Sequence, residues 1–237
     1  TLAAHFGLGP FASMALLTPL AAVGGYALQR GLLNRVVGSD PLPSLIATFG
    51  LSLAIQNLLL ELFSADARSL PGGGLEAASL GLGPLRVGLL PLQIFVAALM
   101  LTVAVQLLLQ RTAFGRALRA SAADADAAAT TGVNPRHVYA GATALAVGVL
   151  GVAAVFQALR VTVSPADGPG QLIYAFEAVI IGGMGSIWGG FLGAMALGVA
   201  QALGARVDAG WGPLTGHVLF LAILAVRPQG LISNVRR

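Results

Sequence analysis

Residues 111–136, Arg111-Thr-Ala-Phe-Gly-Arg-Ala-Leu-Arg-Ala-Ser-Ala-Ala-Asp-Ala-Asp-Ala-Ala-Ala-Thr-Thr-Gly-Val-Asn-Pro-Arg136, form a polar island between two long apolar runs. The island holds four of the chain's 13 basic residues, all of which are arginines, and two of its nine acids. Residues 116–131 lack Pro and Gly and are rich in Ala, the best helix former. Gly132 is placed to stop a helix, and Pro135 cannot continue one. The stretch predicts a short helix-turn unit at a membrane surface.

The composition on both sides of the island is that of a membrane protein. The chain is 57% hydrophobic and 9% charged, whereas a soluble domain has about 25% charged residues. A membrane-spanning helix needs about 20 apolar residues. The apolar runs are continuous, which favours helices over the alternating strands of a membrane barrel. We therefore expect an all-α polytopic membrane protein, a single domain over 1–237 with about seven membrane segments, at 11–28, 43–62, 91–110, 138–159, 172–187, 189–205 and 213–227.

Arginine placement predicts the orientation, because cytoplasmic loops carry excess basic residues. The loop with Arg30 and Arg35, the island, and the tail with Arg227, Arg236 and Arg237 are all predicted to be cytoplasmic. Residues 63–90 then lie outside and are turn-rich, which indicates a small hairpin. Arg68 and Arg86 oppose the bias there, and Asp66 and Glu76 are their possible partners.

The stretch 172–187 is predicted to be a broken membrane segment, because Gly182, Gly183 and Gly185 interrupt it. A broken helix at membrane depth is tolerated where it lines a polar cavity, so this stretch is a candidate for the translocation pathway. A re-entrant loop is the alternative. Glu177 lies within residues 172–187, and an ionisable group at membrane depth is a functional candidate. Glu177 could equally lie at the outer interface, in water or paired with Arg160.

Two further sets of residues are candidates for the pathway or for helix packing. Gly185, Gly189 and Gly193 recur every four residues and are predicted to share one helix face, where small residues allow close packing. Within 43–62, a polar set could line a hydrophilic path or form interhelical hydrogen bonds; it comprises Thr48, Ser52, Gln56 and Asn57.

The sequence gives no sign of enzyme chemistry. There is no cysteine, and His5, His137 and His217 are scattered without metal-ligand spacing. No Walker A, nucleophile-elbow or metalloprotease motif is present. No metal or cofactor is expected. Nucleic-acid binding is not expected either, because the arginines lie at the ends of the spans, as membrane topology requires. Thr1 is preceded by no start residue, so we expect an N-terminally truncated chain.

Four segments in order resemble the inner-membrane permease subunits of branched-chain amino-acid ABC importers, the Liv type. Leu45–Asn57 (LIATFGLSLAIQN) is similar to a conserved family segment, and Thr112–Ala120 with Ala127–Asn134 is similar to the family's coupling loop. Phe176–Gly190 (FEAVIIGGMGSIWGG) and Val226–Leu231 (VRPQGL) are similar to its later motifs. The chain departs from the family's usual residues at three positions: it has Tyr174 where the family usually has Lys, Gln29 where it has Glu, and Val133 where it has Ile. The family's first spans are absent.

The resemblance implies a transport subunit of the bacterial inner membrane without catalytic residues. Its implied partners are a second homologous permease, two cytoplasmic ATPases, a periplasmic substrate-binding protein and membrane lipid. ATP-driven closure of the ATPases would switch the permease between outward and inward access. The coupling residues would lie in the island: Arg116, Arg119, Asp126, Ala127, Ala128 and Gly132. Arg116 and Arg119, three apart on one helical face, could bind acids on the ATPase or, alternatively, only anionic lipid headgroups.

Other functions stay open at this point. A permease of the same family for urea or short amides differs in substrate, which a separate binding protein usually selects. An ion-coupled secondary transporter would show paired broken helices in inverted repeats, and only one broken stretch is visible. An intramembrane enzyme or a structural membrane protein is a third class, for which no nucleophile and base are found.

Overall fold

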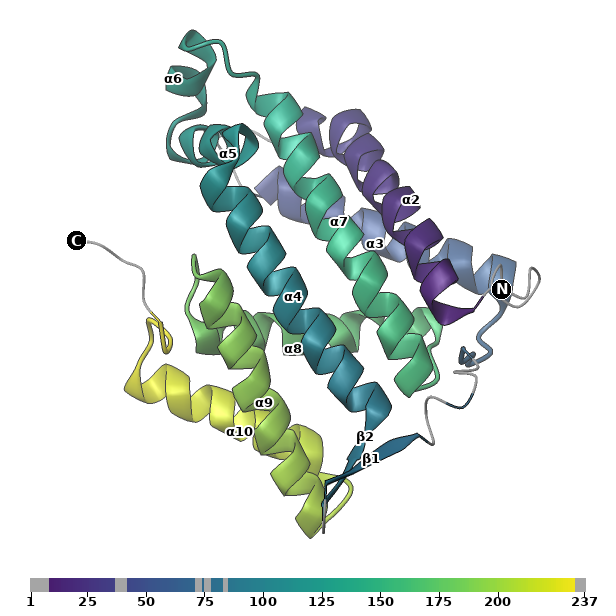
Figure 1. The fold of residues 1–237 in the computed structure, drawn as a ribbon. Coiled ribbons are helices and arrows are strands. Elements are labelled where there is room, and N and C mark those ends of the chain that lie inside the picture. The colour runs from purple at the N-terminus through teal and green to yellow at the C-terminus, as the bar shows by residue number, and fades with distance from the viewer. Residues whose placement is uncertain (1–8, 37–41, 71–73, 75–77, 83–84, 233–237) are drawn as a thin grey trace. The chain divides into compact units, whose positions relative to one another are not determined.

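A computed structural model describes residues 9–36, 42–70, 74, 78–82 and 85–232. Four residues named in the sequence predictions lie outside these ranges: His5, Glu76, Arg236 and Arg237. The described chain is helical apart from one small hairpin (Figure 1). Its contacts divide it into two units, the first being Thr1–Ala97 with Leu107–Ala166 and the second Ala98–Gln106 with Asp167–Arg237.

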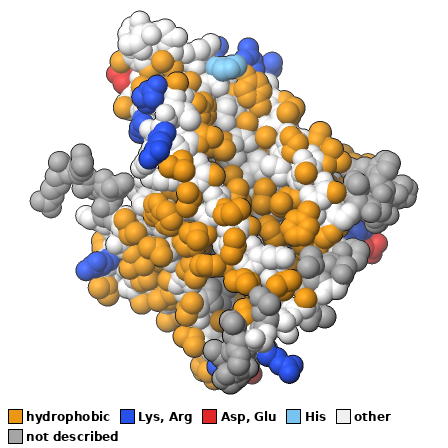
Figure 2. Space-filling model, viewed as in Figure 1, with side chains coloured by type: hydrophobic (Ala, Val, Ile, Leu, Met, Phe, Trp, Pro, Cys, Tyr) orange, Lys and Arg blue, Asp and Glu red, His pale blue; other side chains and the backbone are white. Residues whose placement is uncertain are grey.

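The helices are those of a polytopic membrane protein. Five helical stretches in the described chain are long and apolar enough to cross a bilayer; they are Pro10–Arg35, Leu42–Phe63, Leu89–Arg111, Pro135–Arg160 and Ile187–Val207. Trp211–Val226 is a shorter apolar helix. Figure 2 shows hydrophobic side chains spread over the face in view, as expected of helices that meet lipid.

The first unit is built on α2 (Pro10–Gly31) and α7 (Pro135–Arg160), which pack antiparallel. Small residues permit the close approach: a Cβ added at Gly25 would lie 2.8 Å from Cβ of Val147, and one at Gly148 would lie 3.3 Å from Cβ of Ala22. Near one end of this contact, Thr143 Oγ1 donates a hydrogen bond to Gln29 Oε1 at 2.8 Å. The two helices therefore form a tightly packed pair with a buried polar link.

The rest of this unit joins the pair at its ends. The 3-10 turn η1 (Leu33–Arg35) follows α2, and α3 (Leu42–Phe63) has no buried residue. The N-terminal part of α4 (Leu89–Arg111) packs its Leu90 against Val155, Phe156 and Leu159 of α7. The helices α5 (Ala113–Ala123) and α6 (Ala125–Thr130) then precede α7.

The expected hairpin is present between α3 and α4. Strand β1 (Ser79–Leu82) pairs antiparallel with β2 (Leu85–Gly88), with Ser79 opposite Gly88. Nearby, Arg68 and Val163 exchange two backbone hydrogen bonds of 2.9 and 2.8 Å. The side chain of Arg68 donates to the carbonyl oxygen of Phe63 at 3.1 Å. The suggested ion pair of Arg68 with Asp66 is not found in the described chain.

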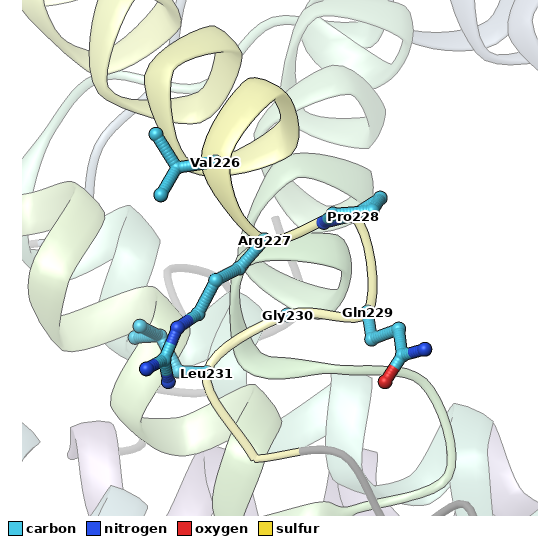
Figure 3. Close-up of a pocket in the computed structure, with 6 residues that line it drawn as sticks. All are labelled: Val226, Arg227, Pro228, Gln229, Gly230 and Leu231. Carbon is cyan, nitrogen blue, oxygen red and sulfur yellow. The ribbon is translucent and has the colours of Figure 1, made fainter.

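In the second unit, α9 (Ile187–Val207) packs against both α8 (Gly168–Gly182) and α10 (Trp211–Val226). Its core is Ala178, Ile181 and Leu197. The 3-10 turn η2 (Pro165–Asp167) leads into α8. After α10 the chain turns through Val226–Leu231, which lines an open cavity of about 340 Å³ (Figure 3). Leu231 N then donates to the carbonyl oxygen of Ile181 at 2.8 Å, so Leu231 is fixed to the end of α8.

Candidate functional site

The island folds as a sharp turn into a short amphipathic helix. Thr112 caps α5, since its hydroxyl accepts a hydrogen bond from Gly115 N at 3.2 Å. A Cβ at Gly115 would collide with the carbonyl oxygen of Leu109, so only glycine fits where α4 meets α5. The chain can therefore leave a long apolar helix and enter α5 without an intervening loop.

Two contacts fix α5 to α7. A Cβ at Gly141 would lie 2.7 Å from the ring of Phe114, so the aromatic ring fills the space that a side chain would occupy. Tyr139 donates its hydroxyl proton to the carbonyl oxygen of Ser121 at 3.0 Å. Phe114 and Gly141 also line an apolar cavity of about 350 Å³ with Leu108, Thr112 and Leu145. A force on α5 would consequently reach α7 directly.

The island contains two helices where the sequence predicted one. Asp124 interrupts the Ala-rich run in an extended conformation, and its Oδ1 accepts hydrogen bonds from Asp126 N at 3.0 Å and Ala127 N at 2.9 Å. Helix propensity alone favours a continuous helix here. The cap overrides it, because an Asp side chain satisfies backbone donors that a helix start leaves free. The signal in the sequence is an Asp two residues before a second Asp.

The helix-turn unit of residues 111–136 ends as Gly132 and Pro135 predict. Gly132 has φ of +86°, a conformation that strains residues with a Cβ. Asn134 then caps α7 by accepting a hydrogen bond from His137 N at 3.3 Å, and Pro135 occupies the first turn of the helix. The turn between α6 and α7 is thus fixed by three residues with distinct backbone requirements.

Most of the proposed coupling residues lie on the surface of this unit, but one does not. Arg116, Asp126, Ala127 and Gly132 are exposed, and Arg119 is exposed while donating to the carbonyl oxygen of Leu109. Ala128 is only 5% exposed. The role of Ala128 in coupling stays a prediction, and its burial indicates that it would act through the shape of the turn and not as an exposed contact. Its carbonyl oxygen instead accepts hydrogen bonds from Val133 N and the Thr131 hydroxyl, which hold the turn.

In the second unit, Glu177 has a partner that the sequence did not suggest. Glu177 lies in the middle of α8, its side chain is 7% exposed, and its Oε1 contacts Nδ1 of His217 on α10. The ring of Tyr174 stacks on the imidazole with a centroid distance of 5.7 Å and an interplanar angle of 5°. Pairing with Arg160, which belongs to the first unit, stays a prediction. His217 stands 40 positions away, so sequence spacing gave no signal.

The glycines of this unit end one helix and pack it against the next. The interruption predicted at Gly182, Gly183 and Gly185 is found: α8 is continuous as far as Gly182, and a turn follows in which Gly183 and Gly185 have φ of +98° and +90°. Gly185 precedes α9, so its expected place on a helix face with Gly189 and Gly193 is wrong. Those two glycines do face α8: a Cβ at Gly189 would meet Gly182, and one at Gly193 would meet the carbonyl oxygen of Ala178.

The polar set on α3 bonds within its own helix. Thr48 donates to the carbonyl oxygens of Ser44 and Leu45 at 3.0 Å, and Asn57 donates to that of Leu53 at 2.8 Å. Ser52 is exposed and Gln56 is half-buried. Their role in a pathway stays a prediction. Within the described residues, no group of three or more His, Cys, Asp or Glu side chains could hold a metal ion.

Comparison with known proteins gives one consistent family. Residues 1–226 match the family described as "Branched-chain amino acid transport system / permease component". The chain is 28% identical to the high-affinity branched-chain amino acid transport system permease protein BraD of Pseudomonas aeruginosa, over 96% of this chain and 75% of BraD. It is 27% identical to LivH of Escherichia coli K12, over 91% of this chain and 71% of LivH.

A third relative is the probable branched-chain amino acid transport permease protein LivH of Methanocaldococcus jannaschii, 27% identical over 98% of this chain and 77% of that protein. No solved structure matches the chain. A permease component is a transport subunit and not an enzyme. The ordered motifs, the apolar helices and the match over residues 1–226 show that the chain belongs to the branched-chain amino-acid ABC transporter permease family.

Proposed function

We propose that the chain is the permease subunit of an ATP-driven importer for branched-chain or related amino acids in a bacterial inner membrane. Its partners in this proposal are a second homologous permease, two cytoplasmic ATPases and a periplasmic binding protein. The family match over residues 1–226 carries the proposal. The relatives BraD and LivH are themselves described as permeases of high-affinity branched-chain amino acid transport systems.

The proposed coupling element is the α5–α6 unit. Arg116, Asp126 and Ala127 are exposed on it, a mixture of charge and small side chains that suits docking against a soluble subunit. The unit is held to α7 by the Phe114–Gly141 contact and the Tyr139–Ser121 hydrogen bond. A displacement of α5 and α6 by the ATPases would therefore move α7, and α2 with it, as a rigid pair.

The proposed membrane arrangement adds α8 and α10 to the five candidate spans, which gives the seven segments that the orientation requires. α8 has 15 residues, so it is shorter than a perpendicular span and would cross as part of a helix pair with α9. Glu177 and His217 supply a polar position among apolar helices. We assign them, together with the polar set on α3, as candidates for the pathway.

One observation favours a second candidate function. A proton-coupled transporter needs neighbouring groups that exchange protons, and the contact between Glu177 and His217 brings two such groups together. The family match favours ATP as the energy source, which separate ATPase subunits would hydrolyse.

Reconstitution in proteoliposomes with the partner subunits separates these functions. We expect accumulation of labelled leucine that requires ATP and persists when an ionophore collapses the proton gradient. Excess isoleucine or valine should compete, whereas excess urea or acetamide should not. Uptake that follows the gradient without ATP would establish the secondary transporter, and competition by urea or acetamide alone would establish the amide permease.

A further inference from the structure

A basic cavity lies in the first unit, where the end of α2 meets the start of α7. It has a volume of about 350 Å³ and is lined by Arg30, Asn34, Arg35, Asn134, Arg136 and His137. Three guanidinium groups therefore share one small open space. In the part of the chain that the structure describes, no carboxylate forms an ion pair with any of them.

Hydrogen bonds hold the cavity in shape. Arg30 Nη1 donates to the hydroxyl of Tyr26 and to Nδ1 of His137, each at 3.1 Å. Asn34 Nδ2 donates to the carbonyl oxygen of Arg136 at 3.0 Å, and Asn34 Oδ1 accepts from Gln29 at 3.1 Å. These bonds link α2, η1 and α7, so the arginines are presented from a preorganised frame.

The position of Arg136 calls for a negative charge. Cations are favourable at the C-terminal end of a helix and unfavourable at the N-terminal end, where the backbone N–H groups give a partial positive charge. Arg30 lies in the last turn of α2, as this rule prefers. Arg136 is the second residue of α7, with two more arginines around the same cavity. An anion in the cavity would relieve both the dipole conflict and the mutual repulsion of the guanidiniums.

The place of the cavity identifies the source of the anion. The candidate spans Pro10–Arg35 and Pro135–Arg160 end and begin at it, so it lies at the boundary between apolar and polar surface. Val23 of α2 and Leu32, which follows α2, are 67% and 42% exposed, so the span that ends at the cavity carries apolar surface that acyl chains could cover. Guanidinium groups bind phosphate oxygens with two parallel hydrogen bonds. Basic pockets between membrane helices bind anionic lipid headgroups in this way.

We propose that this cavity binds the phosphate group of an anionic membrane lipid. The bound lipid would thereby anchor the α2–α7 pair at the end where α7 follows the α5–α6 unit. The phosphate would bridge Arg35 and Arg136, with Arg30 as the third positive charge. This inference rests on the cavity and its charges and does not depend on the substrate that is carried.

Lipid binding to the purified transporter complex tests the proposal. Native mass spectrometry would compare phosphatidylglycerol with phosphatidylcholine on the wild type and on Arg35→Gln, Arg136→Gln and the double variant. Each lost guanidinium should weaken phosphatidylglycerol binding about fivefold, and the double variant about 25-fold. Arg136→Lys keeps the charge and should retain most of the binding. Arg160→Gln makes the same change at the other end of α7 and should have no effect.

Two further arms identify the source of the anion. Inorganic phosphate at millimolar concentration should not displace phosphatidylglycerol, because it lacks the acyl chains; displacement would show a site for a free anion instead. Equal binding of the two lipids to the wild type, or binding that the Gln variants leave unchanged, would overturn the proposal. Loss of ATPase co-purification in the Gln variants with unchanged lipid binding would assign the cavity to an acidic residue of the ATPase and equally overturn it.

Discussion

The carboxylate of Glu177 and the imidazole of His217 are hydrogen-bonded across 40 positions of sequence, and they join α8 to α10. Glu177 is buried, while the His217 side chain is 41% exposed. The second carboxylate oxygen, Oε2, is buried without a hydrogen-bond partner in the described chain. Within the described chain, the Glu177 carboxylate is therefore hydrogen-bonded only to His217.

This asymmetry predicts unequal effects of the two single substitutions. His217→Phe keeps the stacking surface for Tyr174 but leaves Glu177 buried without its partner, which should cost about 1–3 kcal/mol of unfolding free energy. Glu177→Met leaves a histidine that reaches solvent, so its cost should be smaller. The double variant should cost less than the sum, since no polar group is left stranded. Denaturant unfolding of the purified subunit measures all three, and strictly additive losses would show that the contact contributes nothing.

The same double variant separates packing from transport. If Glu177 and His217 belong to the pathway, the double variant should fold and assemble yet lose uptake in proteoliposomes. Wild-type uptake by a stable double variant would exclude a pathway role for the pair.

A matched pair of glycines tests the α8–α9 contact. Gly193→Ala places a methyl group against the carbonyl oxygen of Ala178 and 2.7 Å from Gly182 N, so we expect a loss of about 1–3 kcal/mol. Gly198, on the same helix, has nothing within 4 Å of an added Cβ. Gly198→Ala should be neutral or gain up to about 1 kcal/mol from helix propensity. Similar unfolding midpoints for the two variants would contradict the tight contact.

The cap at Asp124 predicts a local effect on α6. Asp124→Ala removes the acceptor for Asp126 N and Ala127 N and should destabilise α6 by about 1 kcal/mol. Hydrogen exchange of the amides in 125–130 should then accelerate about fivefold, with the amides of α7 unchanged. Asp124→Asn keeps an acceptor and should restore protection. Acceleration in both variants would show that the charge, and not the cap, holds the helix.

The proposed orientation can be tested with single cysteines, because the chain has none. A cysteine at position 74 should react with a membrane-impermeant thiol reagent in intact spheroplasts. A cysteine at position 126 should react only after the membrane is opened. The reverse pattern would invert the arrangement and place the α5–α6 unit beyond the reach of a cytoplasmic ATPase.

The sequence predicted features that depend on neighbouring residues. Gly132 followed by Pro135 marks a helix stop, because the backbone restrictions of both residue types act locally. The small hairpin is likewise local and could be expected from turn residues around 63–90. The polytopic helical class followed from apolar runs of span length.

Features that depend on packing or on competing local effects were missed. The break at Asp124 required weighing a cap against helix propensity, and propensity gave the wrong answer. Gly185 has the spacing of a helix face, but the positive φ of Gly183 and Gly185 ends the helix first. The contact of Glu177 with His217 and the burial of Ala128 arise from tertiary packing, which residue spacing does not encode.

The most direct test of the account measures ATP hydrolysis and leucine uptake together in proteoliposomes that hold the whole transporter, with wild-type permease and with Gly132→Val. A β-branched residue is strained at a φ of +86°, so the variant should distort the turn after α6 while the membrane helices stay assembled. We expect Gly132→Val to bind its ATPases and hydrolyse ATP but to import at most about one tenth as much leucine per ATP, since an uncoupling of about 1.4 kcal/mol corresponds to tenfold. Gly198→Ala should behave as the wild type. Leucine import per ATP that is unchanged in Gly132→Val would contradict the claim that the α5–α6 unit couples ATP hydrolysis to transport through this chain.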